Sequence, residues 1–163
     1  MLTGTRGLMR RILAALFVCA LSAAPASALD GVTEKTVKGE FADVAQDVSD
    51  AIINRGYTVD HKSFIGNMLK RTGPSVGSDK AIYRNAELVQ FCSAVLSRNM
   101  MEADPANIAF CPYVIFYYER EDEPGTIHVG FRRMSEQGSE QSKAATQAIN
   151  NLLDEIIKEA TSE

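Results

Sequence analysis

Hydrophobic positions recur along this chain with two different periods, and these separate predicted helices from predicted strands. Apolar side chains return at helical spacing from Phe41 to Arg55 and again at about residues 140–160, as in helices that bury one face. Ser93 is placed to cap a further helix that runs through Ala103. Alternation with a period of two, together with β-branched and aromatic composition, indicates strands. The predicted strands are Val32 to Lys38, Tyr57 to Ile65, Ile82 to Cys92, Tyr113 to Glu119 and Thr126 to Arg132.

The last two predicted strands are joined by a charged turn that closes on Pro124-Gly125, which indicates a hairpin. In the second of them, Ile127, Val129 and Phe131 share one face, which we predict to be the core face. A hairpin is antiparallel, so we expect a partly antiparallel sheet with helices on one face. The predicted fold is one small α+β domain with the order β-α-β-(α)-β-α-β-β-α.

Residues 1–28 have the composition of an export signal. A positive n-region, an apolar stretch and a small-x-small cleavage site follow one another as Arg6 with Arg10 and Arg11, Ile12 to Leu21, and Ala26-Ser27-Ala28. A membrane span needs about 20 apolar residues, and this stretch ends too early. We therefore expect cleavage before Leu29 and a periplasmic or secreted protein of residues 29–163, with no membrane attachment after cleavage.

Removal of this signal changes the charge of the protein. The chain has 17 basic and 21 acidic residues, and loss of three arginines leaves 14 against 21, a net charge of −7 instead of −4. Nucleic acids and anionic membranes are bound through basic surfaces, so we expect neither as a partner. The remaining 135 residues are enough for one domain.

Two cysteines, Cys92 and Cys111, remain after cleavage and would lie in a compartment where disulfides persist. Their spacing leaves three alternatives open: a disulfide, two buried thiols, or a redox-active or copper-binding pair. A disulfide needs Cα atoms within about 7 Å, which requires antiparallel strands or a loop that doubles back. The Cys-x-x-Cys redox motif and its haem-binding extension do not occur, and we predict no metal or cofactor.

Glu102 and Asp104 are a second pair of candidates. Acids at the C-terminal end of a helix are electrostatically disfavoured, so the two carboxylates could mark a site, although Asp before Pro is also an ordinary helix-to-loop junction. Motifs of serine hydrolases, zinc proteases and phosphate loops do not occur. His61 and His128 are expected to be solvated strand residues, and we expect a non-enzymatic role.

The segment from Glu87 to Glu119 resembles the domain of unknown function 302 family. The resemblance rests on Phe91-Cys92-Ser93, Glu102-Ala103-Asp104-Pro105 and the strand that begins at Tyr113, and it extends over about residues 36–133. It implies a small α+β domain that forms a homodimer, and it implies no activity. Cys111-Pro112 stands where relatives have the order Pro-Cys, so Cys111 does not coincide with the family's second cysteine.

We therefore expect an exported, non-catalytic domain that binds a small molecule or a protein partner of the cell envelope. The alternative is thiol redox or copper handling by Cys92 and Cys111. The predicted site residues are Cys92, Cys111, Glu102 and Asp104, where the third and fourth strands meet the helix that stops at Pro105.

Overall fold

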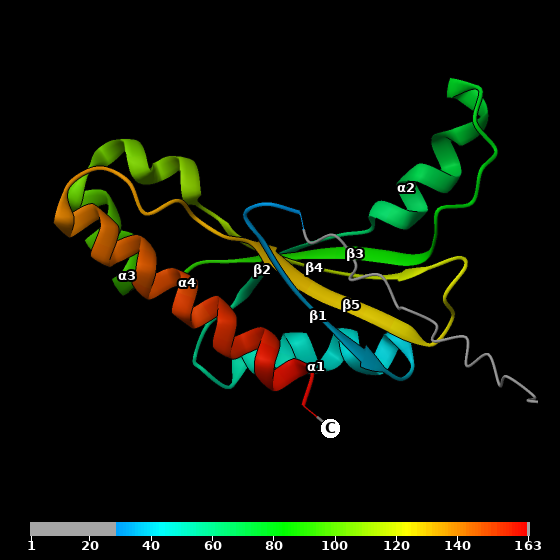
Figure 1. Cartoon of the computed structure of the whole chain (residues 1–163), viewed down its shortest axis with the longest axis horizontal. Helices are drawn as coiled ribbons and strands as arrows, with labels where there is room; N and C mark the ends of the chain where they lie inside the picture. The colour runs from blue at the N-terminus through cyan, green and yellow to red at the C-terminus, as the bar shows by residue number, and fades with distance from the viewer. Residues whose placement is uncertain (1–28, 163) are drawn as a thin grey trace, which may run out of the picture.

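The computed structural model describes residues 29–162, so the predicted export signal lies outside the described residues. Within them the order of elements confirms the predicted α+β class (Figure 1). The strands are β1 (Val32–Lys38), β2 (Val59–Ser63), β3 (Tyr83–Phe91), β4 (Tyr113–Arg120) and β5 (Thr126–Arg132). The helices are α1 (Phe41–Ile53), α2 (Ile65–Thr72), α3 (Ala94–Ala103) and α4 (Glu140–Ala160), with 3-10 turns η1 (Gly73–Val76) and η2 (Pro105–Phe110).

The strands form one sheet in the order β1-β5-β4-β3-β2. Each of the four neighbouring pairs is antiparallel. The predicted hairpin is the β4–β5 pair, in which Tyr117 faces Val129. Of the four pairs, only β4 and β5 are connected by a short turn. Strands β1 and β5 pair although most of the chain lies between them. The sheet is therefore antiparallel throughout.

One face of the sheet carries the core. Ile127, Val129 and Phe131 all belong to it, as predicted, together with Val89 and Tyr117 of neighbouring strands. The helices α1, α3 and α4 contribute buried residues to the same core, and Figure 1 shows α1 and α4 on that side of the sheet. We call this side the helical face, and the other side the open face.

Helix α2 departs from the expectation that the helices gather on one face. It lies on the other side of the sheet from α1 and α4 (Figure 1) and contacts β3. A Cβ atom at Gly66 of α2 would lie 3.0 Å from the backbone nitrogen of Ala86. The missing side chain of Gly66 thus allows the short helix to approach the open face of β3 closely.

Serine side chains cap the N-terminal ends of α3 and α4. The hydroxyl of Ser93 accepts a hydrogen bond from the amide of Leu96 at 3.3 Å and starts α3, as predicted. Ser139 starts α4 in the same way, with the amide of Ser142 at 3.1 Å. Among the described helices, none is long and apolar enough to cross a membrane.

A buried amide attaches α4 to the segment that follows β5. Asn150 has no exposed surface, and its side-chain oxygen accepts from the amide of Met134 at 2.9 Å. Its side-chain nitrogen donates to the carbonyl of Met134, also at 2.9 Å. One side chain therefore satisfies both backbone groups of a residue that no sheet ladder reaches.

Replacing Asn150 by alanine should lower the free energy of unfolding by about 2–3 kcal/mol, because the amide and carbonyl of Met134 lose their partners in a buried place. Urea denaturation followed by circular dichroism measures the change. Asn151 is the neighbouring exposed residue, so Asn151→Ala is the matched control and should stay within about 0.5 kcal/mol. Equal losses in the two variants would contradict the role given to Asn150.

Candidate functional site

The open face of the sheet is hollowed by a groove of about 640 Å³. It lies between the start of β1, the middle of β4 and the segment that leads into β3. Most of its lining is apolar or aromatic, with charged residues among them. The lining residues are Leu29, Val32, Glu34, Lys80, Ala81, Ile82, Tyr83, Phe116, Tyr118, Arg120 and Asp122.

Strand periodicity places the aromatic side chains of the groove. Tyr117 of β4 is fully buried on the helical face, so its neighbours Phe116 and Tyr118 lie on the open face. Gly130 of β5 makes room for Phe116, since a Cβ atom there would lie 2.6 Å from the ring and 2.4 Å from the carbonyl oxygen of Thr33. The ring of Phe116 can therefore lie against the backbone of β5.

Three side chains from three strands form a polar network beside the groove. Tyr118 of β4 donates a hydrogen bond to Oε2 of Glu34 of β1 at 3.0 Å. Oε1 of the same carboxylate lies 2.9 Å from Nδ1 of His128 of β5. The rings of Tyr118 and His128 are stacked with centroids 4.5 Å apart and planes 2° from parallel. Each member thus fixes the orientation of the other two.

The expectation that His128 is solvated is wrong. Its side chain is only 12% exposed, because Tyr118 stacks on one side of the ring. Nε2 lies 3.5 Å from a carboxylate oxygen of Glu123 and has no hydrogen-bond partner among the described residues. His128 therefore lies between two carboxylates, one from β1 and one from the β4–β5 turn.

The pKa of Tyr118 is raised by burial, then by its hydrogen bond to Glu34 and by the negative charge of that carboxylate. Tyr118 therefore keeps its proton at neutral pH and remains a donor to Glu34. Sequence reasoning missed this network, although the alternation in β5 had placed His128 off the core face. The missing information was the partner, because Glu34 precedes His128 by 94 residues.

The structure brings Cys92 and Cys111 together at the opposite end of the β3–β4 pair. Phe91 faces Tyr113 in this pair, so the cysteines flank its last register position. Both thiols are free and partly buried. Sγ of Cys111 lies 3.5 Å from Oγ of Ser97, which is hydrogen-bonded to the hydroxyl of Tyr113 at 2.8 Å.

The surroundings of Cys92 raise the pKa of its thiol. Burial raises the pKa of Cys92, and the neighbouring Cys111 raises it further through its charge and a hydrogen bond. Burial also raises the pKa of the adjacent Tyr113 to about 12. Cys92 is therefore a protonated thiol at neutral pH, which is the weaker form for nucleophilic attack.

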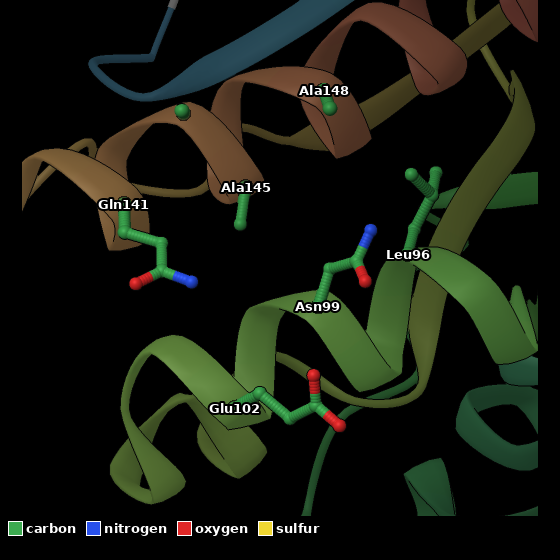
Figure 2. Close-up of a pocket in the computed structure, with 7 residues that line it drawn as sticks. Leu96, Asn99, Glu102, Gln141, Ala145 and Ala148 are labelled. Atoms are coloured by element: carbon green, nitrogen blue, oxygen red, sulfur yellow. The ribbon is translucent and has the colours of Figure 1, made fainter.

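Glu102 and Asp104 lie in two further places. Glu102 lines a cleft of about 300 Å³ between α3 and α4. Figure 2 shows Leu96, Asn99 and Glu102 on α3 and Gln141, Ala145 and Ala148 on α4.

Asp104 accepts a hydrogen bond from the amide of Ala106 at 2.9 Å and so starts η2. This cap explains an acid at the end of α3, because Asp104 belongs to the start of the next turn. The four predicted residues are thus divided between the thiol pair, the cleft and a cap. The described residues contain no group of three or more His, Cys, Asp or Glu side chains placed to hold a metal ion.

Comparison with known proteins places the chain in a family. The family model described as Domain of unknown function DUF302 matches residues 33–160. The crystal structure of an uncharacterized conserved protein DUF302 from Bacillus stearothermophilus has a TM-score of 0.67 at 12% identity, and the match covers 81% of this chain and 99% of that one. At this identity the likeness concerns the fold. No curated protein matches the chain.

Replacing Glu34 by glutamine should lower the pKa of Tyr118, because the negative charge that opposes tyrosinate formation is removed. Because the pKa of Tyr118 is higher in the folded state, this group stabilises the folded protein at pH values below its unfolded pKa of about 10. That stabilisation is lost as the pH rises further. The stability of the variant should accordingly decline less steeply above that pH.

Tyrosinate absorbance in an alkaline titration, with circular dichroism to follow unfolding, measures both effects. Glu136→Gln removes the same charge from an exposed position before α4 and should leave the titration unchanged. Indistinguishable curves for Glu34→Gln and the unaltered protein would show that the network does not form in solution.

Proposed function

This chain belongs to the DUF302 family, and from that premise we propose that it is an exported, non-enzymatic domain that binds a small amphipathic molecule in the open-face groove. The observation that supports this proposal is the groove itself, which combines an apolar and aromatic lining with the Glu34–Tyr118–His128 network. Ligand sites usually combine a mostly apolar concave surface of about 300–1,000 Å³ with a few fixed polar groups. The groove has both properties.

The lining indicates the chemistry of the ligand. Phe116 and Tyr118 offer ring surfaces to a flat apolar body. Arg120 is held by Asp122 through hydrogen bonds of 2.8 and 2.9 Å, so this pair forms a neutral part of the rim. Both oxygens of Glu34 are hydrogen-bonded within the network, so Lys80 is the charged group of the lining left to orient a polar substituent.

The arrangement supports binding better than catalysis. Tyr118 is committed as a donor to Glu34, and His128 is fixed by Glu34 and by stacking. Asp104 is used as a cap, which argues against paired acid–base chemistry with Glu102. These groups therefore support a rigid wall for a ligand.

Leu29 lies both at the predicted cleavage site and in the lining of the groove. If the signal is removed after Ala28, Leu29 becomes the first residue of the mature protein, and it lines the groove. The new α-ammonium group would then lie at the rim. The predicted export signal supports a functional form in the periplasm or outside the cell, and the homodimer implied by the family resemblance stays a prediction.

One observation favours thiol redox or copper handling as the second candidate function. Cys92 and Cys111 are neighbours and are partly exposed, an arrangement that two-thiol chemistry requires. The raised pKa of Cys92 opposes its use as a thiolate nucleophile at neutral pH. We therefore rank ligand binding in the groove above it.

Replacing Ile82 by aspartate should weaken binding of anilinonaphthalene sulfonate, an amphipathic aromatic probe, by about tenfold or more, because a charge enters the apolar lining. Ile82 lines the groove and is 49% exposed, so its replacement should leave the fold intact. Fluorescence enhancement during titration of the full chain measures the affinity.

Ile108→Asp is the matched control, since Ile108 is 64% exposed and lies in η2, away from the groove lining. It should bind the probe like the unaltered protein. If both variants bind equally, or if the unaltered protein does not bind the probe at all, the groove is not the ligand site.

Export predicts a defined mature protein. Expression of the full chain with its own leader should yield, in the extracytoplasmic fraction, a protein whose N-terminal residue is Leu29. Mass spectrometry and N-terminal sequencing measure this. Ala28→Arg should block the processing, because the cleavage site needs a small residue there, whereas Ala28→Ser should be processed normally. A cytoplasmic protein that retains residues 1–28 would contradict export.

A further inference from the structure

The ends of β3 and β4 hold Cys92 and Cys111 in the geometry of a potential crosslink. Directly opposed residues of an antiparallel pair have Cα atoms about 4.5–5.5 Å apart, and Phe91 and Tyr113 are such partners. Cys92 follows Phe91, and Cys111 precedes Tyr113 by two residues. Continued by one position, this register sets Cys92 opposite Pro112 and therefore next to Cys111, and a disulfide tolerates a Cα separation of up to about 7 Å.

We propose that Cys92 and Cys111 form an intramolecular disulfide that closes the α3–η2 segment at the end of the β3–β4 pair. Neither thiol is fully buried, so an oxidant can reach them. The hydroxyl of Ser97 lies beside Cys111 at 3.5 Å, so the pair has a polar neighbour on α3. Cys111 is also among the groups that raise the pKa of Cys92, as expected for two neighbouring thiols.

The oxidant in this step is a disulfide of a small thiol or of a thiol-disulfide exchange protein. The thiolate of one cysteine attacks a sulfur of that disulfide, forms a mixed disulfide and releases the first thiol. The thiolate of the second cysteine then attacks the mixed disulfide, forms the Cys92–Cys111 bond and releases the second thiol. Each cysteine loses one proton, and the two electrons pass to the oxidant.

The crosslink would act on the wall of the α3–α4 cleft. The segment between the cysteines contains α3 and η2, and Leu96, Asn99 and Glu102 of α3 line one side of the cleft (Figure 2). Joining the ends of this segment removes much of the freedom that it gains when it separates from the sheet. Oxidation would thus hold this wall in place, while the open-face groove at the other end of β4 is left unaltered.

The test is oxidation of the full chain, first reduced and then incubated with glutathione disulfide. Peptide mapping should identify a Cys92–Cys111 bond with a mass loss of two hydrogen atoms, and Cys19 is followed separately. The melting temperature of the oxidised protein should exceed that of the reduced protein by about 10 °C. In Cys92→Ser and Cys111→Ser the difference between oxidised and reduced samples should disappear.

Several results would overturn the proposal. These are separate glutathione adducts on the two cysteines, a bond between two chains, thiols that remain free after oxidation, or a crosslink that leaves the melting temperature unchanged. Thiol counting in denaturant needs no variant, so the test does not depend on whether the serine variants fold. Probe binding in the groove is measured independently of the thiols, so failure of this proposal is distinguishable from failure of the proposed function.

Discussion

The antiparallel pairing of β3 with β4 determines where each candidate group of this protein lies. The register runs from Phe91 facing Tyr113 at one end to Tyr83 facing Arg120 at the other. At the first end the two cysteines meet, and at the second end Tyr83 and Arg120 contribute to the groove. A parallel arrangement would have put Cys92 and Cys111 at opposite ends of the sheet, since each lies next to a strand terminus that only antiparallel pairing makes adjacent.

The two faces of β4 contribute to two different parts of the molecule, the core and the groove. Tyr113, Ile115 and Tyr117 are buried in the core of the helical face, while Phe116 and Tyr118 line the groove on the open face. Because the side-chain period of a strand is two, a slip of one residue would exchange these sets. Burial of the core residues therefore also maintains the orientation of the groove residues.

Polar groups in this domain are positioned by partners that are distant in the sequence. Asn150 of α4 satisfies the backbone of Met134, and Glu34 of β1 holds both Tyr118 and His128. Buried polar groups need such partners because an unpaired group costs about 1–3 kcal/mol. The groove network likewise joins side chains of β1, β4 and β5, although its hydrogen bonds are exposed.

Local sequence features predicted most of the elements and much of the core. Hydrophobic periods indicated the five strands and the helices α1 and α4, Ser93 marked the start of α3, and the alternation in β5 assigned Ile127, Val129 and Phe131 to the core, because these features depend on residues close together in the chain.

Only the tertiary structure decided which face α2 covers, that Cys92 and Cys111 meet, and that His128 is enclosed between Glu34 and Glu123. Each of these depends on strand neighbours or on close backbone approach, as where Gly66 meets Ala86, and local periodicity carries no information about such partners. The four candidate site residues were accordingly selected one by one, while their division among three places had to come from the fold.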